Sequence, residues 1–265
     1  MSIQRLVEIM DRLRDPNGGC PWDREQTLES IVPYTIEEVY EVADSIAQGD
    51  MGELCGELGD LLFQVVFYAR IASEQGAFNF DDVVHGICEK MVNRHPHVFA
   101  DAQVADAAEQ SVVWEQLKAE ERQQRATDGQ VGQLDGVAHA LPALLRASKL
   151  QKRAAKVGFD WPDRGAVLEK VREELAELEA ELSLEQGDKR RIADEMGDLL
   201  FSCVNLSRHL GFDAESLLRA ANGKFESRFS AMESRLLEEG YTLTAADLSV
   251  MDAAWDEIKR REGGV

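Results

Sequence analysis

The chain has 265 residues, of which 50 are acidic and 29 basic, and its formal net charge is −21. This charge argues against binding to nucleic-acid polymers or to an anionic membrane surface, because both partners require basic faces. An anionic ligand such as a nucleotide can bind only where metal ions or clustered Lys and Arg side chains reverse the local field.

Apolar residues make up 44% of the chain, which is enough to bury a core. The cysteines Cys20, Cys55, Cys88 and Cys203 form no Cys-x-x-Cys pair, so we expect reduced thiols in a cytoplasmic protein. The first 15 residues carry charges throughout and lack the apolar segment of a signal peptide. No apolar run is long enough for a membrane span, so no membrane partner is expected.

Apolar residues recur with the spacing of a helix, as in the segment that follows Glu57. There they fall three and four residues apart, on one helical stripe that we expect to face the core. This stripe consists of Leu58, Leu61, Leu62, Val65 and Val66. Because alternation with a period of two is scarce, the sequence predicts an all-α protein. The expected helices cover 3–14, 35–48, 51–75, 80–94, 108–125, 142–155, 164–183, 188–209, 213–238 and 249–262.

The second half of the chain repeats motifs of the first half in the same order. The matching pairs are 36–42 with 172–178, 56–63 with 194–201, Lys90 and Arg94 with Lys224 and Arg228, and 114–118 with 255–259. The shared order indicates a duplicated helical unit rather than chance similarity between acidic helices. We therefore expect a first helical domain at 1–126, a linker at 127–140 and a second domain at 141–265.

Each copy carries four carboxylates on two consecutive expected helices. They are Glu38, Glu41, Glu57 and Asp60 in the first copy, and Glu174, Glu177, Glu195 and Asp198 in the second. Residues three apart project from one face of a helix, and apolar neighbours such as Val39 and Leu58 put these acids at the border of the inward face. Two antiparallel helices would thus gather four negative charges that repel one another. A divalent cation relieves this repulsion, and oxygen-only ligation favours Mg²⁺ first and Mn²⁺ next.

Two other interpretations of the acidic motifs compete with a magnesium site. One is a solvated acidic helix face, which the duplication of both motifs makes less attractive. The other is a di-iron site, which requires Glu-x-x-His on two helices, and no histidine stands three residues after a glutamate. Gly59 and Gly197 stand inside the expected helices, where a glycine lowers helix stability. We therefore expect a ligand or another backbone to approach closely at these two positions.

Basic and aromatic residues of the second copy are candidates for nucleotide contacts. Lys224 and Arg228 share a helix face and suit phosphate oxygens, although a salt bridge with Glu226 or Glu233 is the alternative. Trp255 is either a core residue or a platform on which a base stacks. The pair His95 and His97 is interpreted as part of a structured turn rather than a metal site, since soft ligands are missing nearby in the sequence.

Taken together, Glu-Glu-x-x-Glu followed by Glu-x-x-Asp resembles the signature of the MazG family, all-α nucleoside triphosphate pyrophosphohydrolases. The resemblance covers the whole chain, including the duplication. The segments 20–23, 56–68, 94–99 and 157–161 are also similar to those of the family. It implies two tandem helical-bundle units, a homodimer, and Mg²⁺-dependent cleavage of nucleoside triphosphates, both ribo- and deoxyribonucleotides with several bases, to the monophosphate and pyrophosphate.

The resemblance also implies roles for particular residues. The metal ligands would be Glu174, Glu177, Glu195 and Asp198, with Glu38, Glu41, Glu57 and Asp60 as a second candidate site. The nucleotide contacts would be Lys170, Val171, Arg172, Glu173, Glu174, Lys224, Arg228 and Trp255. The second copy is expected to be catalytic and the first structural or regulatory. Glu173 would orient the attacking water, or would act outside the ligand set.

Three alternatives to a broad nucleoside triphosphate pyrophosphohydrolase stay open. A selective hydrolase of a modified or signalling nucleotide would carry the same motifs as a broad house-cleaning enzyme. A non-catalytic nucleotide sensor would bind the same ligands without releasing pyrophosphate. An acidic helical interaction module would bind neither Mg²⁺ nor nucleotide.

Overall fold

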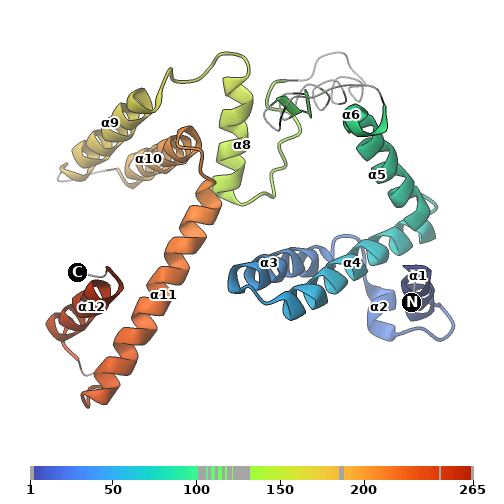
Figure 1. Cartoon of the computed structure of the whole chain (residues 1–265), viewed down its shortest axis with the longest axis horizontal. Helices are drawn as coiled ribbons and strands as arrows, with labels where there is room; N and C mark the ends of the chain where they lie inside the picture. The colour runs from blue at the N-terminus through green and yellow to red at the C-terminus, as the bar shows by residue number, and fades with distance from the viewer. Residues whose placement is uncertain are drawn as a thin grey trace. The chain divides into compact units, whose positions relative to one another are not determined.

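The computed structural model describes residues 3–100, 106, 109–110, 113–114, 117, 121, 132–184, 188–244 and 246–263. The chain divides into two compact units, Met1–Glu120 and Glu121–Val265. All elements of the described residues are helices, and the predicted all-α class with two tandem helical units is confirmed (Figure 1). Among the described helices, none combines the length and hydropathy that a membrane span requires.

The first unit is built around a helix hairpin. Its helices are α1 (Ile3–Leu13), α2 (Pro21–Glu25), α3 (Val32–Gln48), α4 (Met51–Glu74), α5 (Phe80–Arg94) and α6 (Pro96–Phe99). Helix α3 ends at Gly49, whose φ of 74° lies in the left-handed region that favours glycine. Asp50 then begins α4, because its side chain accepts hydrogen bonds from the amides of Gly52 and Glu53. The tight connection sets α3 beside α4, and α1 and α5 also pack on α4.

The second unit repeats the hairpin with different surroundings. Its helices are α8 (Ala143–Ala155), α9 (Arg164–Leu182), α10 (Lys189–His209), α11 (Ala214–Glu238) and α12 (Leu248–Gly263). Asp163 and Asp188 cap the beginnings of α9 and α10 through their side chains. Helix α9 packs on α10, α8 covers part of α10, and α12 packs on α11. The two carboxylate-bearing helices of each copy are therefore direct neighbours.

Helix bounds agree with the sequence expectation within one residue, with few exceptions. Helix α3 begins at Val32 rather than at 35, because Pro33 occupies its first turn, where a missing amide hydrogen has no cost. The short helices α2 and α6 were not expected from the apolar spacing. The expected helix 108–125 lies largely outside the described residues. Residues 127–131 do too, so the linker 127–140 and the boundaries at 126 and 141 stay predictions.

The two units place their buried cores differently. In the first unit the core lies where α1 and the segment before α3 meet α4, and it consists of Met10, Ile31, Val66, Phe67 and Ile71. In the second unit a core lies between α11 and α12, and it consists of Met232, Leu236, Ala254 and Ile258. The α9–α10 hairpin is thus not at the centre of this second core.

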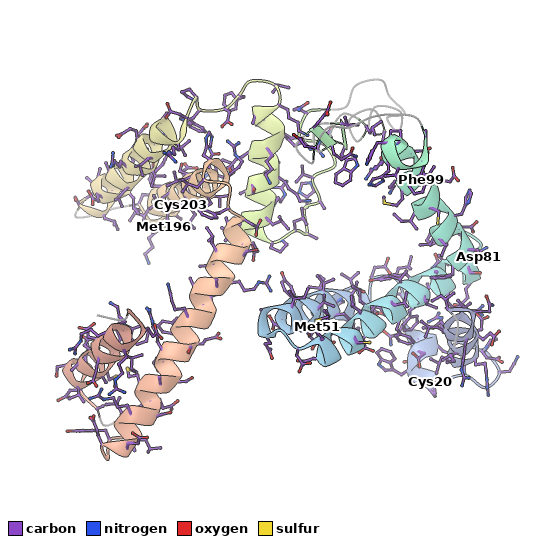
Figure 2. The ribbon with its side chains drawn as sticks, in the orientation of Figure 1. Cys20, Met51, Asp81, Phe99, Met196 and Cys203 are labelled. Carbon is purple, nitrogen blue, oxygen red and sulfur yellow. The ribbon has the colours of Figure 1, made fainter. Side chains whose placement is uncertain are left out.

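The expectation that the carboxylates border an inward face is wrong in part. On α4, Val66 is buried but Leu58 is 50% exposed, and Leu62 and Val65 are also exposed. On α10, Leu200 is 54% exposed, and the exposed Met196 is labelled in Figure 2. The reason is that the described helices of each unit cover its hairpin on one side only. Among the described residues, an apolar face of each hairpin stays exposed.

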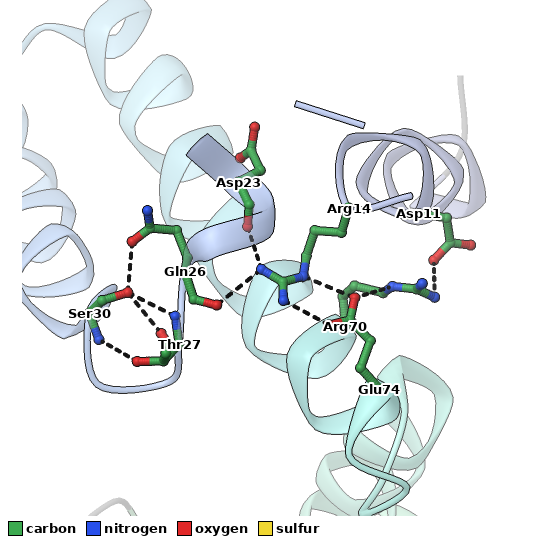
Figure 3. Close-up of polar contacts among 8 residues, drawn as sticks. All are labelled: Asp11, Arg14, Asp23, Gln26, Thr27, Ser30, Arg70 and Glu74. Atoms are coloured by element: carbon green, nitrogen blue, oxygen red, sulfur yellow. Dashed lines mark hydrogen bonds and ion pairs between the residues drawn. The ribbon is translucent and has the colours of Figure 1, made fainter. Parts of the chain in front are cut away.

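A buried arginine ties the N-terminal helices of the first unit to α4. The Arg14 guanidinium donates to both carboxylate oxygens of Glu74, at 3.0 and 2.7 Å, and to the backbone carbonyls of Asp23 and Gln26 (Figure 3). It also lies over the ring of Phe67, 5.5 Å from the centroid. The hydrogen bonds from Arg14 lower the pKa of Glu74, although burial opposes this effect. One side chain therefore fixes α1, α2 and α4 together.

We expect Arg14→Met to reduce the free energy of unfolding of the first unit by about 3 kcal/mol, because it leaves the carbonyls and Glu74 without their partner. Arg70→Met is the matched control, since Arg70 also binds Glu74 but is more exposed. Its cost should be about 1 kcal/mol or less in urea denaturation. Equal losses in the two variants would contradict this account.

The same pair predicts a pH dependence. A carboxyl whose pKa is lowered by folding stabilises the fold above its ordinary pKa of 4.5, and this contribution is lost as the pH falls through the lowered value. The stability difference between the wild-type protein and Arg14→Met should therefore shrink in acid. Urea denaturation at pH 7 and at successively lower pH measures it.

Candidate metal centre

Helices α9 and α10 bring carboxylates of the second unit together. Ligand oxygens of Glu174, Glu195 and Asp198 all lie within 4.8 Å of one another, in what we call the α9–α10 cluster. Glu195 and Asp198 are one turn apart on α10, and Glu174 projects from the neighbouring face of α9. Glu174 is only 5% exposed, whereas Asp198 is open to solvent. The cluster therefore has a buried floor and an accessible rim.

Glu177 is the predicted ligand that this closest group does not include. It is nevertheless near enough to act through its charge. Burial raises the pKa of Glu195, and the charge of Glu177 adds to the rise, followed by those of Glu174 and Asp198. The charges of the other three predicted ligands thus all act on Glu195, although only Glu174, Glu195 and Asp198 belong to the group with oxygens within 4.8 Å of one another.

The first unit forms a corresponding group from α3 and α4. Ligand oxygens of Glu38, Glu41 and Glu57 lie within 4.8 Å of one another, in what we call the α3–α4 cluster. Here Asp60 is the predicted ligand outside the closest group. Burial raises the pKa of Glu38, a hydrogen bond from Gln64 opposes the rise, and the charge of Asp60 adds to it. The amide Nε2 of Gln64 lies 3.4 Å from Glu38 Oε1.

The donor atoms of both clusters fit a hard divalent cation. All of them are carboxylate oxygens, which Mg²⁺, Mn²⁺ and Ca²⁺ prefer over nitrogen or sulfur ligands. Opposite ligands of Mg²⁺ are separated by about 4.2 Å, twice the usual bond length. Separations within 4.8 Å approach this geometry and need only small side-chain movements.

The stretch 170–174 lies along the cluster on α9. Lys170 Nζ lies 2.7 Å from Glu174 Oε1 and 2.9 Å from Glu173 Oε1. The hydrogen bond to Glu174 is the main cause that raises the pKa of Lys170. Arg172 instead pairs with Glu169 at the surface, with both side chains exposed. Sequence reasoning did not anticipate the pair between Lys170 and Glu174, although their four-residue spacing on a helix would have indicated it.

The predicted phosphate and base contacts lie on a different part of the second unit. Arg228 on α11 donates to Glu262 on α12 at 2.7 Å, rather than to Glu226 or Glu233. The ring of Trp255, on α12 and half-buried, lies 5.4 Å from that of Phe225. In Figure 1, α11 extends from the end of α10 and carries α12 at its far end, away from α9. Within the second unit, the structure therefore does not bring this arm to the α9–α10 cluster.

Two further expectations concern the glycines and the histidines. A Cβ added at Gly59 or Gly197 would meet no atom of the described residues within 4 Å, so the expected close approach is not made by these residues. His95 ends α5, and its Nδ1 lies 2.7 Å from the carbonyl oxygen of Met91. Its ring also packs edge-on against Trp114 at 5.2 Å. His95 is thus part of a structured turn, as predicted.

The chain is similar to known proteins over almost its whole length. A family model described as the MazG nucleotide pyrophosphohydrolase domain matches residues 26–99 and again 164–233. A nucleoside triphosphate pyrophosphohydrolase of Escherichia coli (strain K12) is 52% identical over 261 residues, which are 98% of both chains. The nucleoside triphosphate pyrophosphohydrolase/pyrophosphatase MazG of Thermotoga maritima is 43% identical over 257 residues, 97% of this chain and 95% of that one. The uncharacterized protein YabN of Bacillus subtilis is 44% identical over 254 residues, 96% of this chain and 51% of its own length.

The raised pKa of Glu195 predicts a stability effect. A carboxyl whose pKa is raised by folding stabilises the fold below its ordinary pKa of 4.5, and this contribution is lost as the pH rises through the raised value. In chelator near neutral pH, Glu195→Gln should therefore raise the melting temperature of the second unit. Added Mg²⁺ should raise that of the wild-type protein more than that of the variant, by mass action. Differential scanning calorimetry with EDTA or Mg²⁺ measures both; a lower melting temperature of the variant in EDTA would contradict the assignment.

Proposed function

The chain belongs to the MazG nucleotide pyrophosphohydrolase family and is a nucleoside triphosphate pyrophosphohydrolase, and on that premise we propose that its reaction takes place at the α9–α10 cluster. The products are a nucleoside monophosphate and pyrophosphate. The observation that supports the location is the meeting of Glu174, Glu195 and Asp198 beside a lysine. Mg²⁺ is the proposed cofactor, with Mn²⁺ as a substitute.

Each carboxylate has a defined part in this proposal. Glu174, Glu177, Glu195 and Asp198 hold the cation. A bound ion would supply charge neutralisation at the phosphate oxygens and a lower pKa for a water molecule bound to it. Asp198 is exposed and lies on the side from which substrate enters. Glu174 is buried and forms the inner end of the site. The α3–α4 cluster is a second candidate cation site, and the activity is assigned to the second domain, 141–265.

The remaining predicted residues act on the substrate. Lys224 and Arg228 balance the negative charge of the triphosphate, and the stretch 170–174 contacts the nucleotide. Glu173 is exposed beside the cluster and orients the attacking water, or acts outside the ligand set. The water oxygen bonds to a phosphorus of the α–β bridge, the bridging P–O bond breaks, and pyrophosphate leaves.

A broad substrate range follows from how the base would be held. An indole stacks on any base because every base has a π-face, and Trp255 is only half-buried against Phe225. We therefore propose that ribo- and deoxyribonucleotides with several bases are hydrolysed. Such an enzyme would control the nucleotide pool in a house-cleaning or stress-related role. The cytoplasm, where nucleoside triphosphates and Mg²⁺ are abundant, is its proposed location.

We further propose that the working enzyme is a homodimer. The open apolar faces of the hairpins, with Leu58, Leu175 and Leu200 about half-exposed, are surfaces that a second copy can bury. The arm made by α11 and α12 carries Lys224, Arg228 and Trp255, and within the second unit it extends away from α9 (Figure 1). In a two-fold dimer, this arm reaches the α9–α10 cluster of the partner subunit.

Isosteric variants of the two copies test where the chemistry takes place. Glu195→Gln should lower Mg²⁺-dependent pyrophosphate release on the order of 100-fold or more, because a charged ligand is lost without a change in size. Glu57→Gln is the matched variant in the first unit, and its activity should stay within a few-fold of wild type. A panel of ribo- and deoxyribonucleotides, with pyrophosphate and phosphate measured separately, gives the readout. Release of phosphate, or loss of activity only in Glu57→Gln, would contradict the proposal.

Mixing of inactive subunits tests the dimer. A heterodimer of Glu195→Gln and Lys224→Ala subunits has one site with both defects and one site with neither, if each site combines two chains. Equal mixing with subunit exchange should therefore restore about one quarter of wild-type activity, since half of the dimers then carry one intact site of two. Sites built within a single chain would regain nothing, and a monomer in light scattering would also contradict the proposal.

A further inference from the structure

The α9–α10 cluster holds a positive charge of its own. The ammonium of Lys170 lies 2.7 Å from Glu174 Oε1, and Glu174 is one of the three carboxylates with oxygens within 4.8 Å of one another. The Glu174 side chain is 7% exposed, so this ion pair has little competition from water. Glu174, a candidate metal ligand, is therefore already paired with the ammonium of Lys170.

A divalent ion and this ammonium cannot share the cluster in the observed geometry. Two like charges a few ångströms apart at a partly buried site repel each other strongly. A divalent ion that binds Glu174 also takes up the carboxylate charge that attracts Lys170. The ammonium must then leave the oxygen, and the lysine has a flexible four-carbon chain with which to do so.

We propose that Lys170 is the resident counter-cation of the α9–α10 cluster, and that a divalent cation displaces its ammonium from Glu174. This inference rests on the proposed metal site and adds a coupling to it. Lys170 becomes free to contact a substrate phosphate only when the cation occupies the cluster. Lys170 is thus a substrate-contacting residue whose availability depends on the bound ion.

Glu173 provides the acceptor that makes the exchange possible. Its Oε1 is already 2.9 Å from Lys170 Nζ, and its side chain is 57% exposed. Glu173 belongs to neither the closest carboxylate group nor the proposed ligand set. The released ammonium can therefore keep one carboxylate partner at the rim of the cluster while it moves outward.

The first unit offers an internal contrast. At the position that corresponds to Lys170, the repeat has Tyr34, which is exposed and packs edge-on against Trp22 at 5.7 Å. There Glu38 accepts its hydrogen bond from the neutral amide of Gln64, 3.4 Å away. The two copies thus carry similar carboxylates, but a lysine is the partner in one and a glutamine amide in the other.

Titration of the full-length protein with Mn²⁺ in the absence of nucleotide tests the exchange. Glu38→Gln and Glu57→Gln are included in every sample so that the α3–α4 cluster does not contribute. Free Mn²⁺ is followed by electron paramagnetic resonance, and circular dichroism checks that each variant is folded. Lys170→Met should lower the Kd for Mn²⁺ about three- to tenfold, because no ammonium has to be displaced.

Two control variants separate displacement from a general change of charge. Lys170→Arg keeps a cation within reach of Glu174, and its Kd should stay near that of the parent. Arg172→Met removes the same charge from a side chain that pairs with Glu169 at the surface, and should change the Kd less than about twofold. An unchanged Kd in Lys170→Met, or equal tightening in Arg172→Met, would overturn the exchange but leave the metal site intact. Absence of saturable Mn²⁺ binding in the parent would overturn both.

Discussion

Repulsion among carboxylates on two paired helices is the constraint around which each unit is organised. Glu174, Glu195 and Asp198 have oxygens within 4.8 Å of one another, and Glu174 is almost fully buried. At such a site the charges cannot all stay ionised without compensation. The raised pKa of Glu195 and the ammonium of Lys170 on Glu174 are two local responses. A divalent cation is the third response that we propose, and it would turn an unfavourable cluster into a binding site for a triphosphate.

The two copies meet this constraint with different side chains. In the second unit a lysine pairs with the buried carboxylate, whereas in the first unit the Gln64 amide contacts Glu38. The surroundings differ as well, since Arg14 ties α1 and α2 to α4 in the first unit, whereas α12 in the second unit packs on α11. The two copies thus share the carboxylate pattern but differ in the residues that lie beside it. This difference agrees with the proposal that only the second copy is catalytic.

Local features were predictable from the sequence, and features that depend on distant parts of the chain were not. Helix bounds followed from apolar spacing, because this pattern reflects interactions within a few residues along the chain. The grouping of Glu174 with Glu195 followed because two neighbouring helices are joined by a short connection. The exposure of Leu58 and the position of α12 away from α9 did not follow, since a pattern of apolar residues does not say which segment covers them. The pair of Lys170 with Glu174 could have been predicted, because a spacing of four residues places the two side chains side by side on a helix.

The position of the cation relative to Lys170 tests the central claim most directly. Crystals of the full-length protein grown with Mn²⁺ would locate the ion by its anomalous scattering. We predict a peak bound by Glu174, Glu195 and Asp198, with the ammonium of Lys170 no longer within hydrogen-bond distance of Glu174. A cluster without Mn²⁺, in which Lys170 keeps its 2.7 Å contact with Glu174, would contradict the account.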